Sequence, residues 1–157
     1  MRSIALQALA TFLFLGACGG TGDLMGGHDH SNMGGDALTF GRSGTESDVS
    51  RTVKVSTLDS LRFDPESIEV EEGETIKFVV TNPGRIEHEF VLGDTEYQRS
   101  HGGGAATMDH DSGNGQVLQP GQTAEVIWTF DEGGEVLFAC HVDDHYSAGM
   151  YGTVAVR

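Results

Sequence analysis

The chain has 157 residues, which is long enough for one domain with a hydrophobic core and flanking segments. Its 24 acidic and 9 basic residues give a formal net charge of −15, which argues against nucleic acid as a partner. The same charge favours metal cations or a basic protein partner. The two cysteines, Cys18 and Cys140, lie in segments of different character, so we expect no disulfide between them.

The N-terminus has the pattern of a bacterial secretory signal. A basic start at Arg2 is followed by an apolar run over residues 4–15, which is too short to span a bilayer as a helix. The next residues, Leu-Gly-Ala-Cys, resemble a lipobox, which predicts cleavage after residue 17 and a lipid on Cys18. An ordinary signal peptide that ends near a cysteine is the alternative. We expect residues 1–17 to be this signal and the mature chain to lie in the periplasm or cell envelope, touching the membrane only through the lipid.

Residues 18–50 lack a sustained apolar period and are rich in Gly, Ser, Thr and Asp, which is typical of a flexible tether. Within nine residues this segment carries Met25, His28, His30 and Met33. Imidazole and thioether groups bind copper, and the thioether favours the cuprous ion. We interpret these four residues as an accessory copper site; the alternative is a polar linker in which they have no role.

From residue 51 the pattern changes to short alternating segments separated by turn residues, with no convincing helical period. We expect about seven or eight strands in an antiparallel β-sandwich over residues 51–157. Alternation places His88 and Cys140 on inward faces, and Glu87 and Glu89 on the outward face.

The segment after the strand that ends at Cys140 contains the order Cys-x4-His-x4-Met, formed by Cys140, His145 and Met150. A thiolate, imidazoles and a weak thioether are the ligands of a copper site that exchanges one electron. Zinc also accepts Cys and His, but zinc does not use methionine as a fourth ligand. Cys140 as a nucleophile is disfavoured by its apolar strand face, and we find no other catalytic motif, so we do not expect an enzyme.

These motifs resemble those of the cupredoxins, the type 1 copper proteins. The resemblance covers roughly residues 51–157, and its spacing is similar to that of rusticyanin and the auracyanins. It rests on Asn82-Pro83-Gly84 before His88-Glu89-Phe90, on Phe138-Ala139-Cys140, on the Cys140…His145…Met150 loop and on the closing Gly152–Val156. It implies a Greek-key sandwich, one copper with His88, Cys140 and His145 as equatorial ligands and Met150 as the axial ligand, and one-electron transfer. Phe90, Phe138 and Trp128 are candidates for the apolar surroundings of the metal.

A long insertion at about 93–122 departs from the small electron carriers of this family. It contains His101, Met108 and His110, which repeat the composition of the tether and form a second candidate accessory copper site. A glycine-rich loop without a role is the alternative, although residues 94–98 have a weak helical signal. His141 should point away from the copper, and we interpret it as a surface histidine.

Two functions remain open. The chain is either a one-electron carrier with a redox protein partner, for example a basic cytochrome-like protein, or a copper-tolerance protein that sequesters or oxidises excess copper. The carrier needs one copper and a docking surface. The tolerance protein should bind additional copper through the His and Met residues outside the core site.

Overall fold

The computed structural model describes residues 38–101 and 112–157, all of which belong to one compact unit that begins at Met33. The predicted signal, lipidated Cys18, and the copper ligands Met25, His28, His30, Met33, Met108 and His110 lie outside the described residues. No helix in the described ranges is long and apolar enough to cross a membrane.

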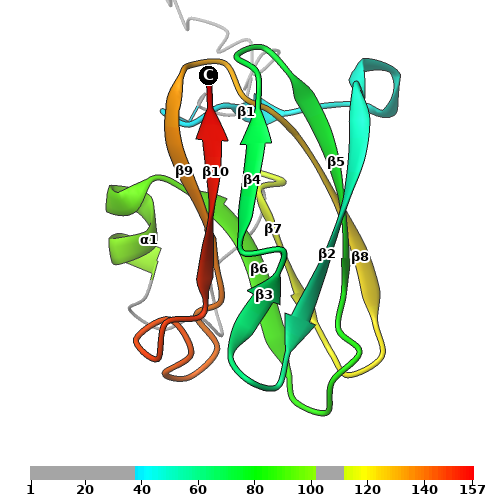
Figure 1. Cartoon of the computed structure of the whole chain (residues 1–157), viewed down its shortest axis with the longest axis vertical. Helices are drawn as coiled ribbons and strands as arrows, with labels where there is room; N and C mark the ends of the chain where they lie inside the picture. The colour runs from blue at the N-terminus through cyan, green and yellow to red at the C-terminus, as the bar shows by residue number, and fades with distance from the viewer. Residues whose placement is uncertain (1–37, 102–111) are drawn as a thin grey trace, which may run out of the picture. The chain divides into compact units, whose positions relative to one another are not determined.

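The described residues form two five-stranded sheets packed face to face as a β-sandwich (Figure 1). The first sheet has the order β1 (Arg42–Ser43), β8 (Thr123–Thr129), β5 (Thr75–Thr81), β2 (Arg51–Leu58), β3 (Arg62–Asp64). The second has the order β4 (Ser67–Val70), β10 (Tyr151–Val156), β9 (Gly134–Ala139), β6 (His88–Gly93), β7 (Gly115–Leu118). The predicted sandwich is confirmed.

The expectation of purely antiparallel sheets is wrong for two strand pairs. β2 runs parallel to β5, and β4 runs parallel to β10, while the remaining pairs are antiparallel. Alternation within a strand is the same in either pairing, so the sequence pattern does not report strand direction. The parallel partners are brought together by chain connections that cross from one sheet to the other.

Aromatic rings fill the space between the sheets. Phe90 and Phe138, from the neighbouring strands β6 and β9, stack at a centroid distance of 5.5 Å. Phe63 and Phe78 pack against this pair at 5.1 Å from Phe138 and 5.4 Å from Phe90, respectively. All four rings are at most 1% exposed. Such aromatic contacts add to the hydrophobic free energy of burial and make the core rigid.

Part of the predicted tether belongs to the folded unit. Phe40 is only 6% exposed and stacks on Trp128 at 5.6 Å, while the Trp128 indole N–H donates to the Phe40 carbonyl oxygen at 3.1 Å. The short strand β1 pairs with β8, and a 3₁₀ helix, η1 (Glu46–Asp48), follows it. The tether boundary at residue 50 is therefore wrong for residues 38–50, whose short and polar segments gave no periodic signal.

The described ends of the predicted insertion are also ordered. Residues Thr95–His101 form helix α1, which lies beside the sheet that contains β6 and β9, and Gly115–Leu118 form β7 at the edge of that sheet (Figure 1). Asp94 precedes the helix, and its carboxylate accepts a hydrogen bond from the Tyr97 backbone N–H at 2.7 Å. An N-cap of this kind satisfies one of the free N–H groups of the first turn.

Candidate metal centre

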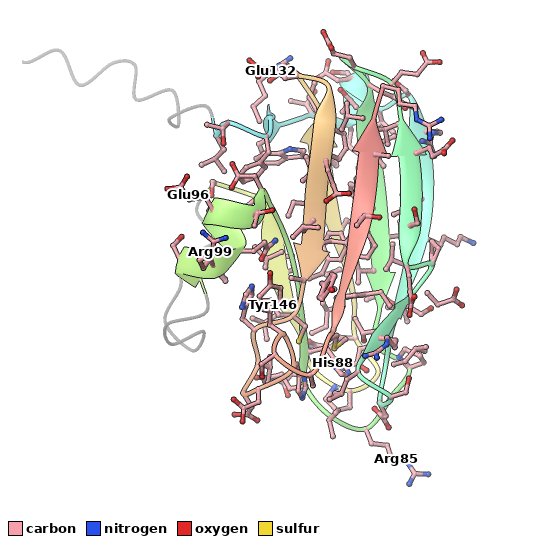
Figure 2. The ribbon with its side chains drawn as sticks, turned by 60° about the vertical axis from the view of Figure 1, so that its left-hand side comes forward. Arg85, His88, Glu96, Arg99, Glu132 and Tyr146 are labelled. Atoms are coloured by element: carbon pink, nitrogen blue, oxygen red, sulfur yellow. The ribbon has the colours of Figure 1, made fainter. Side chains whose placement is uncertain are left out.

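The predicted metal ligands meet at one end of the sandwich, where β6 begins and β9 ends. His88 is the first residue of β6, Cys140 directly follows β9, and Met150 directly precedes β10. Because β6 and β9 pair antiparallel, with Val91 opposite Ala139, their ends bring His88 and Cys140 together. His145 lies in the loop between β9 and β10. Figure 2 shows His88 and Tyr146 at this end and Glu132 at the other.

His88, Cys140 and His145 form the only group of three or more His, Cys, Asp or Glu residues with clustered ligand atoms in residues 38–101 and 112–157. One ligand atom from each lies within 4.8 Å of the others. The Cys140 Sγ atom is 3.3 Å from His145 Nδ1 and 3.9 Å from His88 Nδ1. Both imidazoles therefore present Nδ1 to the same sulfur atom, as a shared metal ion requires.

Met150 is fully buried in the same apolar cluster as Cys140, Phe90 and Phe138. Backbone hydrogen bonds attach it to the other residues of the loop. The Met150 N–H donates to the His145 carbonyl at 2.9 Å, and the Cys140 N–H donates to the Met150 carbonyl at 3.2 Å. The loop is thus closed on itself by bonds between the three residues predicted as ligands, which fixes their backbone positions without a metal ion.

Two further contacts brace the segments on either side. Arg62, at the start of β3, donates to the carbonyl oxygens of Ala148 and Gly149, each at 3.3 Å. In the loop before β6, the buried Asn82 amide donates to the carbonyls of Ile86 and Leu118 at 2.8 Å and 3.0 Å. The Asn-Pro-Gly turn predicted from the sequence is therefore held by its own asparagine just before His88.

Burial changes the proton affinity of the site. Burial raises the pKa of the Cys140 thiol to about 11, although hydrogen bonds from the backbone N–H groups of Glu89 and Val142 lower this pKa in part. Burial also lowers the pKa of His88, and the nearby His145 lowers it further. At neutral pH the metal-free site therefore holds a protonated thiol and a neutral His88 imidazole, and a bound cation takes the place of the thiol proton.

The donor set fits copper. One thiolate, two imidazoles and a buried thioether suit both oxidation states of that metal, and no additional cysteine is within the cluster to suit a structural zinc site. The second nitrogen of His88, Nε2, is buried without a hydrogen-bond partner among the described residues, and its closest acidic atom is Asp59 Oδ1 at 4.0 Å. Coordination of a metal through Nδ1 would leave this nitrogen near a carboxylate, at a distance longer than a direct hydrogen bond.

The outer side of β6 and β9 differs from the expectation. Glu89 faces away from the core as predicted, yet it is fully buried, because α1 covers it. His141 also points away from the cluster, but it is 4% exposed and not a surface residue. Alternation predicts the face on which a side chain lies, whereas burial on that face depends on a helix packed from elsewhere. Glu89 lies between His88 and Phe90 in the strand, and nothing in this alternation predicts that a helix covers it.

His101 lies at the end of α1, 3% exposed, with Nε2 at 3.3 Å from Glu89 Oε1. It is separate from the cluster of His88, Cys140 and His145. The three aromatic residues predicted near the metal, Phe90, Phe138 and Trp128, all belong to the buried core cluster that contains Cys140 and Met150. Trp128 stacks on Phe40, in the part of β8 that pairs with β1.

A family model described as "Copper binding proteins, plastocyanin/azurin family" matches residues 49–157. The chain belongs to this copper-binding family, the cupredoxins. It is also similar to proteins named "Copper-resistant cuproprotein CopI". The relative from Rubrivivax gelatinosus is 39% identical over 140 residues, covering 83% of this chain and 85% of the relative. The relative from Pseudomonas aeruginosa is 33% identical over 150 residues, covering 75% of this chain and 82% of the relative.

Solved structures agree with the cupredoxin fold. The reduced auracyanin of Roseiflexus castenholzii superimposes with a TM-score of 0.60 at 22% identity, covering 69% of this chain and 98% of that protein. Auracyanin B superimposes with a TM-score of 0.62 at 21% identity, covering 77% of this chain and 96% of that protein. The sequence-based resemblance to the cupredoxins is confirmed, and copper is the cofactor of the family.

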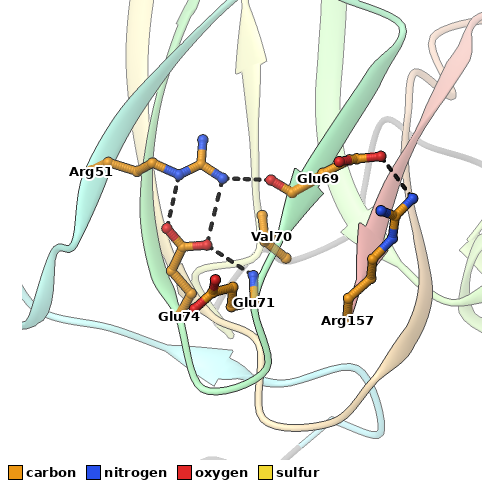
Figure 3. Close-up of a pocket in the computed structure, with 6 residues that line it drawn as sticks. All are labelled: Arg51, Glu69, Val70, Glu71, Glu74 and Arg157. Carbon is orange, nitrogen blue, oxygen red and sulfur yellow. Dashed lines mark hydrogen bonds and ion pairs between the residues drawn. The ribbon is translucent and has the colours of Figure 1, made fainter.

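The opposite end of this cupredoxin has a shallow hollow of about 500 Å³ (Figure 3). It is lined by Arg51, Glu69, Val70, Glu71, Glu74 and Arg157. Its charged groups pair with one another: Arg51 Nε lies 2.8 Å from Glu74, and Arg157 lies 2.7 Å from Glu69. Ion pairs at the surface contribute little to the free energy of folding. The hollow lies at the far end of β10 from Met150, so it has no part in the metal centre.

Proposed function

We propose that this cupredoxin holds one type 1 copper between His88, Cys140 and His145, with the Met150 sulfur as a fourth and weaker donor. The observation that carries the proposal is the convergence of two imidazole Nδ1 atoms on one buried thiol. When bound, copper supplies a one-electron Cu(II)/Cu(I) couple. The sandwich and the closed loop keep the four residues in place in both oxidation states, and the buried aromatic rings exclude water.

The first experiment is a titration of the metal-free protein with Cu(II), followed by visible absorption and EPR. We expect an intense thiolate-to-copper charge-transfer band that saturates at one equivalent. Cys140→Ser should abolish this band because it removes the thiolate, while Cys18→Ser should leave it unchanged. A protein that binds Cu(II) at this site without colour would contradict the type 1 assignment.

For the biological use of the site we propose copper tolerance in the bacterial envelope, ahead of electron transport alone. Three relatives, each similar to this chain over most of its own length, are named copper-resistant cuproproteins. One of them, from Vibrio cholerae, is 31% identical over 132 residues. The chain also carries His and Met residues outside the core cluster that a simple carrier does not need. In this proposal they capture excess copper. A captured Cu(I) ion gives one electron to Cu(II) at the core site, and the core site passes that electron to a redox protein partner.

Copper stoichiometry distinguishes the two uses. We expect more than one copper per chain after loading, with the excess lost when three histidines are replaced together by alanine: His28, His30 and His110. His101 stays in place in this variant because it is buried against Glu89. A single copper that is unaffected by these changes would favour the electron carrier. Deletion of the gene should reduce growth in copper without a respiratory defect. The reverse pattern would support a carrier with a redox partner, which the acidic surface suggests is basic.

We also propose that the mature chain is attached to the membrane surface through a lipid on Cys18. The support is the sequence Leu-Gly-Ala-Cys after a short apolar run. Fractionation of cells that express the full chain tests this directly. Cys18→Ser should move the protein from the membrane fraction to the soluble envelope fraction, and recovery of both forms in the soluble fraction would contradict the anchor.

A further inference from the structure

A closed circuit of buried polar contacts lies on the outer side of Cys140, between the sheet and α1. The Glu89 carboxylate accepts a hydrogen bond from the His141 backbone N–H at 3.0 Å, and its other oxygen lies 3.3 Å from His101 Nε2. His141 Nε2 in turn lies 2.7 Å from the Gln98 side-chain oxygen. Two residues of α1, Gln98 and His101, therefore contact Glu89 and His141.

Glu89 connects this circuit to the sulfur atom of the metal centre. Its backbone N–H donates to Cys140 Sγ at 3.2 Å, while its carboxylate holds the N–H of His141, the residue that follows Cys140. A single residue thus joins the start of β6 both to the Cys140 sulfur and to the residue that follows Cys140. A shift of Glu89 would change the direction and length of the hydrogen bond to the sulfur.

The helix holds its end of the circuit firmly. The Gln98 amide donates to the Val91 carbonyl at 2.9 Å, which fixes the orientation of its side-chain oxygen toward His141. The His101 ring stacks on Tyr97 at 5.4 Å and contacts the His141 ring edge-on at 5.0 Å. Figure 2 shows α1 beside this part of the sheet, with Arg99 on the helix and Tyr146 below it.

Burial of these groups is costly unless each finds a partner. Glu89 and Gln98 have no exposed surface, and His101 and His141 are 3% and 4% exposed. Removal of a carboxylate or an amide from water costs several kcal/mol if it stays unpaired, and an apolar interface under α1 would avoid that cost. The polar circuit therefore calls for an explanation beyond stability, and its contact with Cys140 supplies one.

We propose that Glu89 is a positioning residue for the copper thiolate and that α1 sets its position through Gln98 and His101. Hydrogen bonds to a cysteine ligand tune the reduction potential of a copper site. Helix α1, at the start of the insertion after β6, is thereby coupled to the reduction potential of the metal centre. This inference rests on the proposed copper site and adds a determinant of its potential.

The test compares Glu89→Ala with Glu89→Gln in the full-length protein loaded with one equivalent of copper. Glu89→Ala leaves the His141 N–H without its acceptor, so we expect the charge-transfer band to shift. We also expect the Cu(II)/Cu(I) ratio at a fixed applied potential to change by about fivefold or more, the lower end of typical coupling between sites. Glu89→Gln should restore the band, because its amide oxygen accepts the same N–H. Glu96→Gln, on the exposed side of α1, is the matched control and should behave as the parent.

Metal-free protein provides a second readout. We expect exchange of the His141 amide hydrogen to be slow in the parent and in Glu89→Gln and faster in Glu89→Ala. If Glu89→Ala does not fold, His101→Ala replaces it, with Arg99→Ala as control, and should shift the copper ratio. In Glu89→Ala/His101→Ala the two effects should be non-additive, since both act through the position of one carboxylate.

The results separate this inference from the proposed function. Copper-loaded parent protein without a charge-transfer band would overturn the copper site itself. A coloured parent with the same band and the same Cu(II)/Cu(I) ratio in Glu89→Ala would overturn only the positioning role. Unchanged values in His101→Ala would overturn the coupling to α1.

Discussion

At the scale of single residues, Cys140 illustrates how one position serves both the core and the metal centre. Its side chain is fully buried among aromatic rings, which makes the thiol hard to ionise, yet a backbone N–H and two imidazoles face the sulfur. A soft cation that replaces the thiol proton would gain the thiolate and both imidazoles as ligands, while the backbone N–H continues to donate to the sulfur. The same burial that protects the thiol in the metal-free protein also excludes water from the bound metal.

Asp94 carries a prediction on pH dependence. The Thr39 hydroxyl donates to its carboxylate at 2.5 Å and the Tyr97 N–H at 2.7 Å, and these hydrogen bonds hold the pKa of Asp94 below its ordinary value. Because the folded-state pKa is lower than the unfolded one, the stabilisation is complete above about pH 4 and is lost as the pH falls through the folded value. Asp94→Ala should therefore lower the free energy of unfolding at pH 7 by about 0.5–2 kcal/mol, the usual value of an N-cap.

Urea unfolding of the metal-free protein at pH 7 and at pH 3 measures this difference. The gap between Asp94→Ala and the parent should be smaller at pH 3, which lies below the ordinary carboxyl pKa, because the unfolded chain binds the proton there more readily than the folded one. Glu132→Ala, an exposed residue at the far end of the sandwich, serves as the control and should show no such change. A gap that widens as the pH falls would contradict the role assigned to Asp94.

At the scale of elements, the contact between β9 and β10 depends on a glycine. Gly152 lies opposite Phe138 in the antiparallel register, and the Phe138 ring occupies the space that a side chain at 152 would need. The carbonyl oxygen of Glu66, the residue before β4, also lies against this space. Only glycine at this position lets the aromatic core extend beneath the strand that follows Met150.

Gly152→Ala should therefore destabilise the protein by about 1–3 kcal/mol through overpacking. Thermal unfolding of the metal-free protein is the measurement. Gly133→Ala is a suitable control, because a Cβ there would face only the far end of the Glu72 side chain and a distant backbone oxygen. Equal stability of the two variants would show that the Phe138 ring can move aside without cost.

Helix α1 is a second element that determines the environment of residues in other elements. It turns the outer face of β6 and β9 from a solvent-exposed surface into an interior, and it changes the role of Glu89 and His141 accordingly. Its seven residues would be too few to form a stable helix alone. The Asp94 cap, the Gln98 hydrogen bonds and the contact of Tyr97 with Phe40 at 5.2 Å hold it in place.

At the scale of the whole molecule, the folded unit extends further toward the N-terminus than the family match, which begins at residue 49. Phe40 contacts both Trp128 of the first sheet and Tyr97 of α1. Phe40→Ala should lower the free energy of unfolding by about 3 kcal/mol, as expected for loss of a buried phenylalanine.

Ile86→Ala, which removes an apolar side chain that is 40% exposed, should cost much less and is the control. Chemical denaturation of the copper-free protein gives both values. A loss of stability in Phe40→Ala no greater than in Ile86→Ala would mean that residues 38–50 rest on the sandwich without stabilising it.

The sequence by itself determined the class of fold and predicted the residues of the candidate metal centre. Three of the four predicted ligands lie within eleven residues of one another along the chain, so their proximity needs only a short loop, and period-two alternation placed His88 and Cys140 on inward faces. Strong turn residues before His88 and after β8 marked where strands end. Such local patterns depend on backbone geometry alone, so they can be interpreted without knowledge of the rest of the structure.

Only the tertiary structure decided what covers each face. The parallel pairing of β2 with β5, the packing of Phe40 on Trp128 and the cover of α1 over Glu89 all join residues far apart in sequence. Alternation reports the side of a strand on which Glu89 and His141 lie, but not whether water or a helix occupies that side. A residue that the pattern assigned to solvent is thus the buried contact between α1 and the Cys140 sulfur.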